Sequence, residues 1–241
     1  MANICCVIPA RLNSSRFDRK LLKKINGIPL LEFVRRKIMQ SFLNTDIFIT
    51  TGDKEIEKII NKYDGNIIKS KKKHKDGTSR VIEAIAILNY KNVLIVQGDE
   101  PLVSKKILNK FKKIIMNNPN VKCFNYVTKL KKEKDIYDEN IVKCILSKDK
   151  YIIDAFRKNS KYKFKDIYKL QGIFSFNRKF LLNINNLKQN KRQKIEKIEQ
   201  LRIILSKNRL KAIIGDEDYQ SVNTLSDFIK VKKILNNSID K

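Results

Sequence analysis

The chain has 241 residues, of which 42% are hydrophobic, so it is long and apolar enough to fold around a sizeable core. Its 53 Lys and Arg residues outnumber its 25 Asp and Glu residues and give a formal net charge of +28, which favours an anionic partner. No run of about twenty apolar residues occurs and no signal-peptide pattern opens the chain, so we expect no membrane partner.

Composition also separates two kinds of anionic partner. Lysines are spread along the chain, and the dense basic run at 69–75 lacks the arginines and aromatic residues typical of nucleic-acid surfaces. We therefore expect a small anionic substrate and no nucleic acid. A nucleic-acid-binding module, which would bind polymers in a salt-sensitive way, is the alternative of a different class. The four cysteines match neither a disulfide framework nor a zinc site, which indicates reduced thiols in a cytoplasmic protein.

Strands and helices alternate in the N-terminal part of the chain. Apolar runs typical of buried parallel strands are found at 4–8, 47–51, 66–68 and 93–96. Helical patterns begin at Pro29 and recur at 54–63 and 79–88. This order makes βαβ units and predicts an α/β fold with a mostly parallel central sheet and helices on both faces. The loops after its strands should converge on one ligand-binding cleft.

The pattern changes after residue 120. Strands are predicted at 122–128, 141–146, 151–156 and 170–176, with few helices between them. We therefore expect a small strand-rich lobe at about residues 121–190, within a single domain that spans residues 1–241. A polar loop at 157–166, a helix at 194–206, a strand at 210–214 and a final helix at 225–235 complete the predicted elements.

The segment after the first strand carries four cations, namely Arg11, Arg16, Arg19 and Lys20. A nucleoside triphosphate needs fixed positive charge around its phosphates. Arg11 and Arg16 can each donate two hydrogen bonds to phosphate oxygens, and Lys20 can place a point charge at the α-phosphate. The alternative is a solvated basic loop.

An acidic residue, Asp99, follows the buried strand at 93–96. Mg²⁺ prefers carboxylate and phosphate oxygens, so an aspartate at the carboxyl end of such a strand predicts a metal site beside a triphosphate. The alternative is a turn or helix-capping acid, because Asp after Gly is common in turns.

Four motifs, in the same order along the chain, resemble those of the cytidylyltransferases that activate sugar acids, above all the 3-deoxy-manno-octulosonate cytidylyltransferase (CMP-Kdo synthetase) family. The first is IPAR–x4–R–x3–K from Ile8 to Lys20, followed by NGIPL at 26–30. The others are HKDGTSR at 74–80, VQGDEP at 96–101 and EQLR at 199–202. The resemblance runs over nearly the whole chain and is strongest up to about Leu102.

The resemblance implies a Rossmann-like nucleotidyltransferase fold whose strand-rich lobe serves sugar binding and dimerisation. It implies that CMP is transferred from CTP to the anomeric hydroxyl of a 3-deoxy-2-keto sugar acid, Kdo or a close relative, with release of pyrophosphate. Mg²⁺ would be the cofactor. The partners would be CTP, an acidic sugar and a second copy of the chain, in the cytoplasm and in lipopolysaccharide biosynthesis.

The resemblance also assigns residues to each part of the site. The catalytic residues would be Arg16, Lys20 and Asp99. The nucleotide would be bound by Pro9, Ala10, Arg11, Lys20, His74, Gly77, Thr78, Arg80 and Gln97. The sugar acid would be bound by Gln97, Arg157, Phe174, Glu199 and Gln200. The metal ligands would be Asp99 and Asn223; the family has an aspartate at position 223, and an uncharged asparagine there should weaken metal binding.

Several positions depart from the family pattern. Leu170 stands where the family has His, Phe174 where it has Tyr, and Phe17-Asp18-Arg19 where it has a Leu-Pro-Gly-like stretch. A pocket that lacks hydrogen-bonding groups selects a different sugar or binds its sugar more weakly. Two alternatives therefore stay open: a cytidylyltransferase for another sugar acid (acylneuraminate-type or amino-Kdo), and a catalytically weakened relative that binds nucleotide.

Overall fold

The computed structural model describes residues 4–14, 16–158 and 162–237 of the protein. Their contacts divide the chain into two compact units. The first contains the described residues up to Lys112 and those from Tyr219 onward, and the second contains Lys113–Asp218. No helix among the described residues is long and apolar enough to span a membrane.

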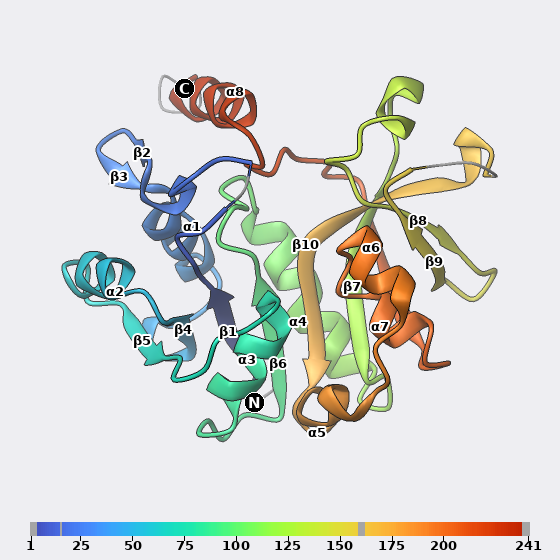
Figure 1. Ribbon diagram of the computed structural model, residues 1–241, viewed down its shortest axis with the longest axis horizontal. Coiled ribbons are helices and arrows are strands. Elements are labelled where there is room, and N and C mark those ends of the chain that lie inside the picture. The colour runs from blue at the N-terminus through green and yellow to red at the C-terminus, as the bar shows by residue number, and fades with distance from the viewer. Residues whose placement is uncertain (1–3, 15, 159–161, 238–241) are drawn as a thin grey trace. The chain divides into compact units, whose positions relative to one another are not determined.

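The first unit is built on four parallel strands in the order β5-β4-β1-β6 (Figure 1). Their bounds are Asn66–Lys69 for β5, Ile47–Thr51 for β4, Ile4–Pro9 for β1 and Asn92–Val96 for β6. The helices are α1 (Leu30–Met39), α2 (Lys54–Asn61), α3 (Gly77–Ile85) and α8 (Leu225–Asn236). A small hairpin of β2 (Lys24–Ile25) and β3 (Ile28–Pro29) precedes α1, and α4 (Lys105–Asn117) leads into the second unit.

Strand order determines where this unit can bind a ligand. The chain moves outward from β1 through α1 and α2 to β5, then returns through α3 to β6 on the other side of β1. Right-handed crossovers place α1 and α2 on one face and α3 on the other. The order reverses between β1 and β6, and ligands of such sheets bind at the carboxyl ends of the strands at that point.

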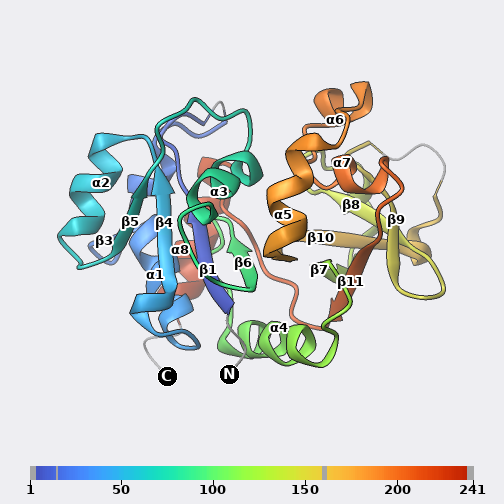
Figure 2. The ribbon, with the colours of Figure 1, turned by 90° about the horizontal axis from the view of Figure 1, so that it is seen from below.

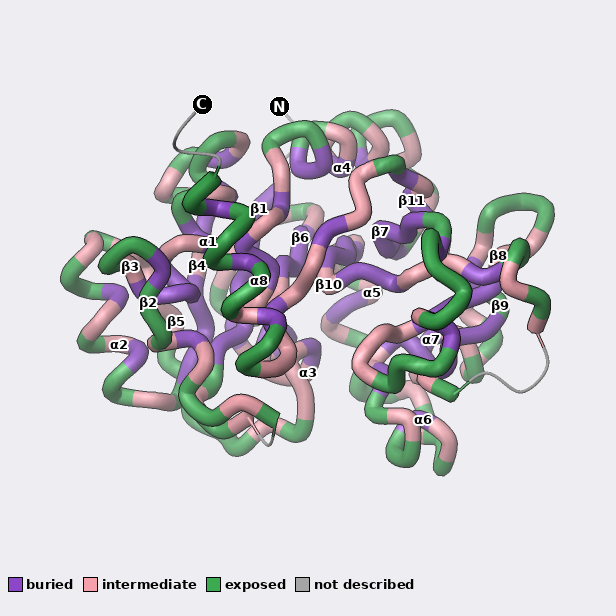
Figure 3. The backbone as a smooth tube through the Cα atoms, turned by 90° about the horizontal axis from the view of Figure 1, so that it is seen from above, coloured by how far each residue is buried: buried purple, intermediate pink, exposed green. Residues whose placement is uncertain are grey.

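Burial explains why these residues form the sheet. All six residues of β1 are buried, as are all residues of β6 except its first (Figure 3). Strands covered on both faces need apolar side chains on both sides, which explains the continuous rather than alternating hydrophobic pattern. Helix α2 buries only Ile56 and Ile60, which lie one turn apart, and exposes its charged side to water.

A buried carboxylate stabilises α1. Glu32 is fully buried and accepts hydrogen bonds from Arg35 at 2.7 and 3.0 Å and from Arg36 at 2.8 Å. Arg35 continues the network by donating to the backbone oxygen of Tyr63 at 2.8 Å. A buried charge is tolerated only when paired and hydrogen-bonded, so this network connects α1 to the end of α2.

The second unit has five strands in the order β10-β7-β11-β9-β8, and β8 also pairs with β10 (Figure 2). Only β7 and β11 run parallel; the other pairs are antiparallel. The strands are β7 (Cys123–Lys129), β8 (Lys143–Leu146), β9 (Tyr151–Phe156), β10 (Ile167–Asn177) and β11 (Leu210–Gly215). The helices are α5 (Arg178–Asn183), α6 (Lys191–Glu196) and α7 (Leu201–Ile204).

Apart from shifts of a few residues at the ends of elements, two predicted elements differ from the structure. The helix predicted at 194–206 is two short helices, α6 and α7, because Lys197 adopts the left-handed conformation (φ 52°) and ends α6. The loop predicted at 157–166 contains a helical turn at Phe164–Asp166, and its residues 159–161 lie outside the described part of the chain. Helix α4 has no counterpart among the predicted elements.

Candidate active site

The cation-bearing loop leaves β1 at Pro9 and is held by backbone contacts. The Ala10 N–H donates to the Thr50 carbonyl at 2.9 Å, and the Leu12 N–H donates to the Asp53 carboxylate at 2.9 Å. Further on, Phe17 packs edge-to-face against Phe228 of α8, with ring centroids 5.8 Å apart. The loop is therefore fixed to β4, to the residues after β4 and to α8.

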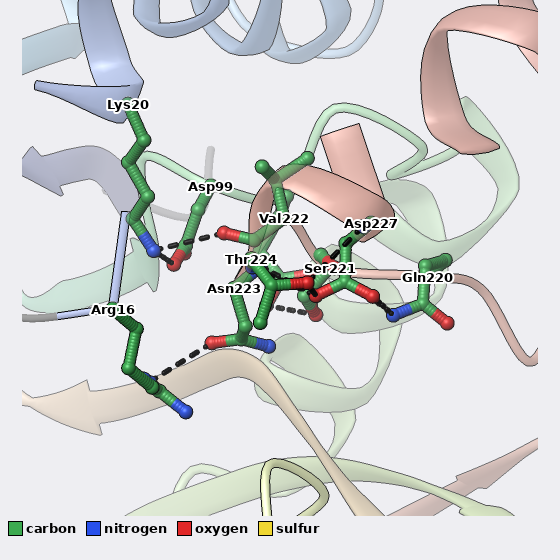
Figure 4. Close-up of polar contacts among 10 residues, drawn as sticks. Arg16, Lys20, Asp99, Gln220, Ser221, Val222, Asn223, Thr224 and Asp227 are labelled. Carbon is green, nitrogen blue, oxygen red and sulfur yellow. Dashed lines mark hydrogen bonds and ion pairs between the residues drawn. The ribbon is translucent and has the colours of Figure 1, made fainter. Parts of the chain in front are cut away.

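Two predicted catalytic residues meet at the carboxyl ends of β1 and β6. The Lys20 ammonium forms an ion pair with the Asp99 carboxylate and also donates to the Val222 carbonyl at 2.8 Å (Figure 4). The Val222 N–H donates back to the Asp99 carbonyl at 2.9 Å. The Lys20 and Asp99 side chains are 12% and 20% exposed, so a ligand can reach them while most of their surface is covered.

The third predicted catalytic residue, Arg16, lies in the same cluster. Its Nη2 donates to Oδ1 of Asn223 at 3.1 Å (Figure 4). Asn223 follows Val222 directly, so the segment before α8 supplies an acceptor to each of two loop cations. The structure thus brings together Arg16, Lys20, Asp99 and Asn223, which come from three distant parts of the sequence.

Two carboxylates fix the segment that supplies these acceptors. Both Glu100 oxygens accept from the Ser221 hydroxyl at 2.9 Å, and Glu100 is 3% exposed. Asp227 caps α8 in a capping box with Thr224, whose N–H and hydroxyl both donate to Oδ2 at 2.9 Å. The predicted elements included α8, but this hydrogen-bonded scaffold was not predicted, although Thr224 and Asp227 have the spacing of a capping box.

Four predicted nucleotide-binding residues lie together at the start of α3, namely Pro9, Gly77, Thr78 and Gln97. A Cβ atom added to Gly77 would lie 3.2 Å from the Pro9 ring and 3.4 Å from Nε2 of Gln97. Glycine therefore permits a close approach that any side chain would crowd. Thr78 beside it is 8% exposed, and Asp76 caps the helix by accepting from the Ser79 N–H at 2.8 Å. Helix α3 therefore starts at Gly77, two residues before the predicted start.

Arg80 points back from α3 toward the end of β4. Its Nη1 is buried and has no hydrogen-bond partner among the described residues, and it lies 3.7 Å from where a Cβ of Gly52 would be. Burial lowers the pKa of the guanidinium; the nearby charge of Asp53 opposes this effect and that of Arg11 adds to it. The two predicted nucleotide-binding arginines, Arg11 and Arg80, are therefore within electrostatic range of each other.

The lysine-rich loop before α3 is organised by Glu83. This carboxylate accepts from the Ser70 hydroxyl at 2.7 Å and from the Lys71 N–H at 3.0 Å, and it faces Nε2 of His74 at 2.5 Å. Burial raises the pKa of Glu83, but these hydrogen bonds outweigh it and hold the value at about 2. The His74 ring thus faces Glu83, and its predicted role in binding nucleotide stays a prediction.

The residues predicted to bind only the sugar lie in the second unit. Arg157 Nε donates to the Glu196 carbonyl at 2.8 Å and Nη1 to the Glu139 carbonyl at 2.7 Å. Phe174 is 2% exposed, and Glu199 is half-buried. These contacts show how Arg157 is held, and the predicted roles of all three residues toward a sugar stay predictions.

Gln200 belongs to a buried network that was not predicted. Its Nε2 donates to Oδ1 of Asn125 at 3.0 Å. Asn125 in turn donates to the carbonyls of Gln171 at 3.0 Å and Ile173 at 3.2 Å, across the register shift in β10. Its amide fills the gap in the ladder that the irregularity leaves, which satisfies two buried carbonyls.

A metal at this site would take most of its ligands from the substrate. Among the described residues no group of three or more His, Cys, Asp or Glu side chains could hold an ion by itself. Mg²⁺ is often held by one or two carboxylates together with substrate phosphates. The Asp99 carboxylate is of the right chemistry, so it fits an ion that arrives with a triphosphate; the predicted metal-ligand role of Asn223, whose amide oxygen accepts from Arg16, stays a prediction.

The fold and the site together define a class of protein. A doubly wound parallel unit presents arginine, lysine and a carboxylate at the carboxyl ends of β1 and β6, where its strand order reverses. This arrangement is that of a nucleotide-binding α/β protein with the charge needed for phosphoryl chemistry.

Comparison with known proteins makes the class specific. The sequence model of the family described as Cytidylyltransferase matches residues 5–213, so the chain belongs to the cytidylyltransferase family. A 3-deoxy-manno-octulosonate cytidylyltransferase of Thermodesulfovibrio yellowstonii is 30% identical over 96% of this chain and 97% of its own. One of Syntrophus aciditrophicus is 27% identical over 98% of each chain. The resemblance predicted from the motifs is confirmed, as is the class of CTP-dependent nucleotidyltransferase.

Solved structures confirm the fold class. A CMP:2-keto-3-deoxy-manno-octonic acid synthetase complexed with CTP matches with a TM-score of 0.89 at 21% identity, over 98% of this chain and 99% of that one. A 4-diphosphocytidyl-2C-methyl-D-erythritol synthase from Anaerococcus prevotii matches with a TM-score of 0.62 at 17% identity, over 97% and 98%. The predicted Rossmann-like nucleotidyltransferase fold is therefore correct.

Proposed function

We propose that this protein transfers CMP from CTP to the anomeric hydroxyl of 3-deoxy-manno-octulosonate or a close relative and releases pyrophosphate. One observation carries the proposal: Lys20 and Asp99 form an ion pair at the carboxyl ends of β1 and β6. The relatives that match this chain over nearly its whole length are named 3-deoxy-manno-octulosonate cytidylyltransferase. In the reaction the anomeric oxygen bonds to the α-phosphorus, the bond to the pyrophosphate breaks, and the hydroxyl proton is released.

The loop cations serve the phosphates in this proposal. Arg16 and Arg11 bind phosphate oxygens, since a guanidinium matches their geometry. Lys20 stabilises the negative charge that grows on the α-phosphate and on the leaving pyrophosphate. The contact of Lys20 with Val222 supports this role, because a carbonyl orients the ammonium without neutralising it.

Asp99 would hold Mg²⁺ together with the phosphates of CTP, and a bound Mg²⁺ supplies charge neutralisation at the reacting phosphate. The Lys20 ammonium also forms an ion pair with the Asp99 carboxylate. With CTP and Mg²⁺ bound, Lys20 would face the triphosphate and Asp99 would hold the ion, so both charges would keep an opposite charge beside them.

The base and the sugar acid would be bound by separate parts of the chain. Pro9, Ala10, Gly77, Thr78 and Gln97 would contact the nucleoside, where the absent side chain of Gly77 lets the backbone approach a flat ring. The sugar acid would be bound by Arg157, through its carboxylate, and by Gln97, Phe174, Glu199 and Gln200. We further propose a cytoplasmic homodimer that acts in lipopolysaccharide biosynthesis.

A second candidate acceptor has a structural basis. Leu170 and Phe174, at positions where the family has His and Tyr, are 8% and 2% exposed and offer no side-chain polar group. A pocket built without these groups would favour a sugar acid that does not depend on them, such as an amino-modified Kdo or an acylneuraminate.

Pyrophosphate release with CTP, Mg²⁺ and a panel of sugar acids tests the proposal. We expect turnover with Kdo or a near relative, none with ATP or GTP in place of CTP, and none from a Lys20→Ala variant. Turnover with another acid alone would move the assignment to the second candidate. Absence of turnover with every acid, together with retained CTP binding, would leave only a nucleotide-binding relative.

A further inference from the structure

The amide of Asn223 occupies a distinctive place in the site. Its Oδ1 accepts a hydrogen bond of 3.1 Å from Arg16 Nη2, across 207 positions of sequence (Figure 4). The family pattern has an aspartate here, which would be a metal ligand. The structure instead directs the side chain at a cation of the phosphate-binding loop.

The main chain on either side of this amide is fixed. The Asn223 N–H donates to Oδ2 of Asp227 at 3.1 Å, and Gln220 Nε2 donates to Oδ1 of the same carboxylate at 2.9 Å. Ser221 is held by Glu100, and the Val222 carbonyl is held by Lys20 at 2.8 Å. The Asn223 side chain therefore projects from main chain that is held on both sides, and its amide faces Arg16.

An asparagine and an aspartate at position 223 would differ in their effect on the charge of Arg16. An amide oxygen accepts a hydrogen bond from a guanidinium and adds no negative charge beside it. A carboxylate at the same place would compete with phosphate oxygens for Arg16 and would repel a triphosphate. The neighbouring Val222 carbonyl likewise accepts a hydrogen bond from Lys20 without adding a negative charge.

We propose that Asn223 is a positioning residue for the triphosphate: it orients Arg16 toward the phosphates without neutralising it, and it does not act as a metal ligand. The proposal rests on the proposed function, in which Arg16 binds CTP. The family's aspartate would contribute a negative charge that binds a metal. In this chain the neutral amide favours binding of the triphosphate, because it does not neutralise the positive charge of Arg16.

Two variants separate these roles. In calorimetric titrations of CTP, with EDTA and again with saturating Mg²⁺, Asn223→Asp should weaken binding by about tenfold and Asn223→Ala by about threefold. Asn223→Ala should have no further effect in an Arg16→Ala background, since the amide acts through Arg16. Asn109→Asp, an exposed position in α4 with the same change of charge, should bind CTP like wild type.

Each of these measurements can contradict the proposed role of Asn223. Tighter CTP binding by Asn223→Asp in Mg²⁺, with less Mg²⁺ needed for half-saturation, would overturn the proposal and restore a metal-ligand role. An undiminished effect of Asn223→Ala without Arg16 would also overturn it. If wild type binds no CTP under either condition, the proposed function fails first; if it binds CTP and Asn223→Asp binds equally well, only the inference about Asn223 fails.

Discussion

The ion pair of Lys20 and Asp99 joins the two charges on which the chemistry depends. Each side chain compensates the charge of the other, and both are mostly buried. Removal of one member of a partly buried pair leaves the other charge without its partner. Loss of one member should therefore affect the other member in a way that binding measurements can detect.

The substitution Asp99→Asn tests this coupling at the scale of single residues. We expect kcat to fall by about a hundredfold or more, because the carboxylate that would hold the metal is lost. Affinity for CTP measured in EDTA should stay the same or rise, because Lys20 is released from its anionic partner. Asp149→Asn removes a carboxylate whose side chain is 81% exposed and should leave both quantities unchanged. Turnover close to that of wild type would remove Asp99 from the reaction.

Some residues of the site could be predicted from the sequence and others could not. Lys20 and Asp99 were predictable because each follows a buried strand, and the carboxyl ends of neighbouring parallel strands lie together. The contact of Arg16 with Asn223 was not, since hydrogen bonds between distant segments depend on loop conformation. Asn125, which holds Gln200, lies within an apolar strand and gave no sequence signal apart from being polar.

At the scale of elements, the ends of helices depend on capping hydrogen bonds and backbone conformations that the hydrophobic pattern of the sequence reveals only in part. Helix α3 starts earlier than predicted because Asp76 caps it. Helix α4 was overlooked in a lysine-rich stretch, although Ile107, Leu108, Phe111 and Ile115 are all buried and have helical spacing. The break at Lys197 was unpredictable, since lysine has no preference for the left-handed conformation.

Helix α1 depends on its buried carboxylate. The substitution Glu32→Gln keeps the shape of the side chain but leaves Arg35 buried without an anionic partner. Loss of one member of a buried pair should lower the free energy of unfolding by about 3 kcal/mol. Denaturant titration measures it, and Glu133→Gln, at an exposed position, should change the value by less than about 0.5 kcal/mol. Equal midpoints for both variants would show that α1 does not need the charge.

The loop before α3 should respond to acid through Glu83. Its pKa is lowered to about 2 in the folded protein, so the carboxylate stabilises the fold at pH values above its ordinary pKa of about 4.5. That stabilisation should be lost as the pH falls from about 4.5 through about 2, because the unfolded chain takes up the proton first. Amide hydrogen exchange at Lys71 should remain slow at pH 5 and become faster, after correction for intrinsic rates, toward pH 2.5.

The variant Glu83→Gln provides the comparison for this prediction. It should show faster exchange at Lys71 at every pH, without the step below pH 4.5, since its amide has no proton to gain. A step of equal size in both proteins would assign the acid response to another carboxylate.

At the scale of the whole molecule, the net charge of +28 acts on every anionic ligand. Such a field speeds the encounter with CTP and with a sugar acid, and salt screens it with a Debye length of about 8 Å at physiological ionic strength. The same charge would attract nucleic acid, which is why composition alone left two classes of partner open. The family assignment favours small anions, and salt dependence can show how the charge is used.

Steady-state kinetics between 50 and 500 mM salt should show a fall in kcat/KM for CTP of about tenfold and little change in kcat, because screening slows encounter and leaves the bound complex unaffected. Added double-stranded DNA should compete weakly, and its effect should vanish at the upper end of the salt range, as expected for non-specific phosphate contacts. A value of kcat/KM that does not respond to salt would mean that the charge of the site, not of the whole surface, governs association. Tight binding of DNA that abolishes turnover even in high salt would instead revive the nucleic-acid-binding alternative, because only a dedicated surface makes contacts that survive screening.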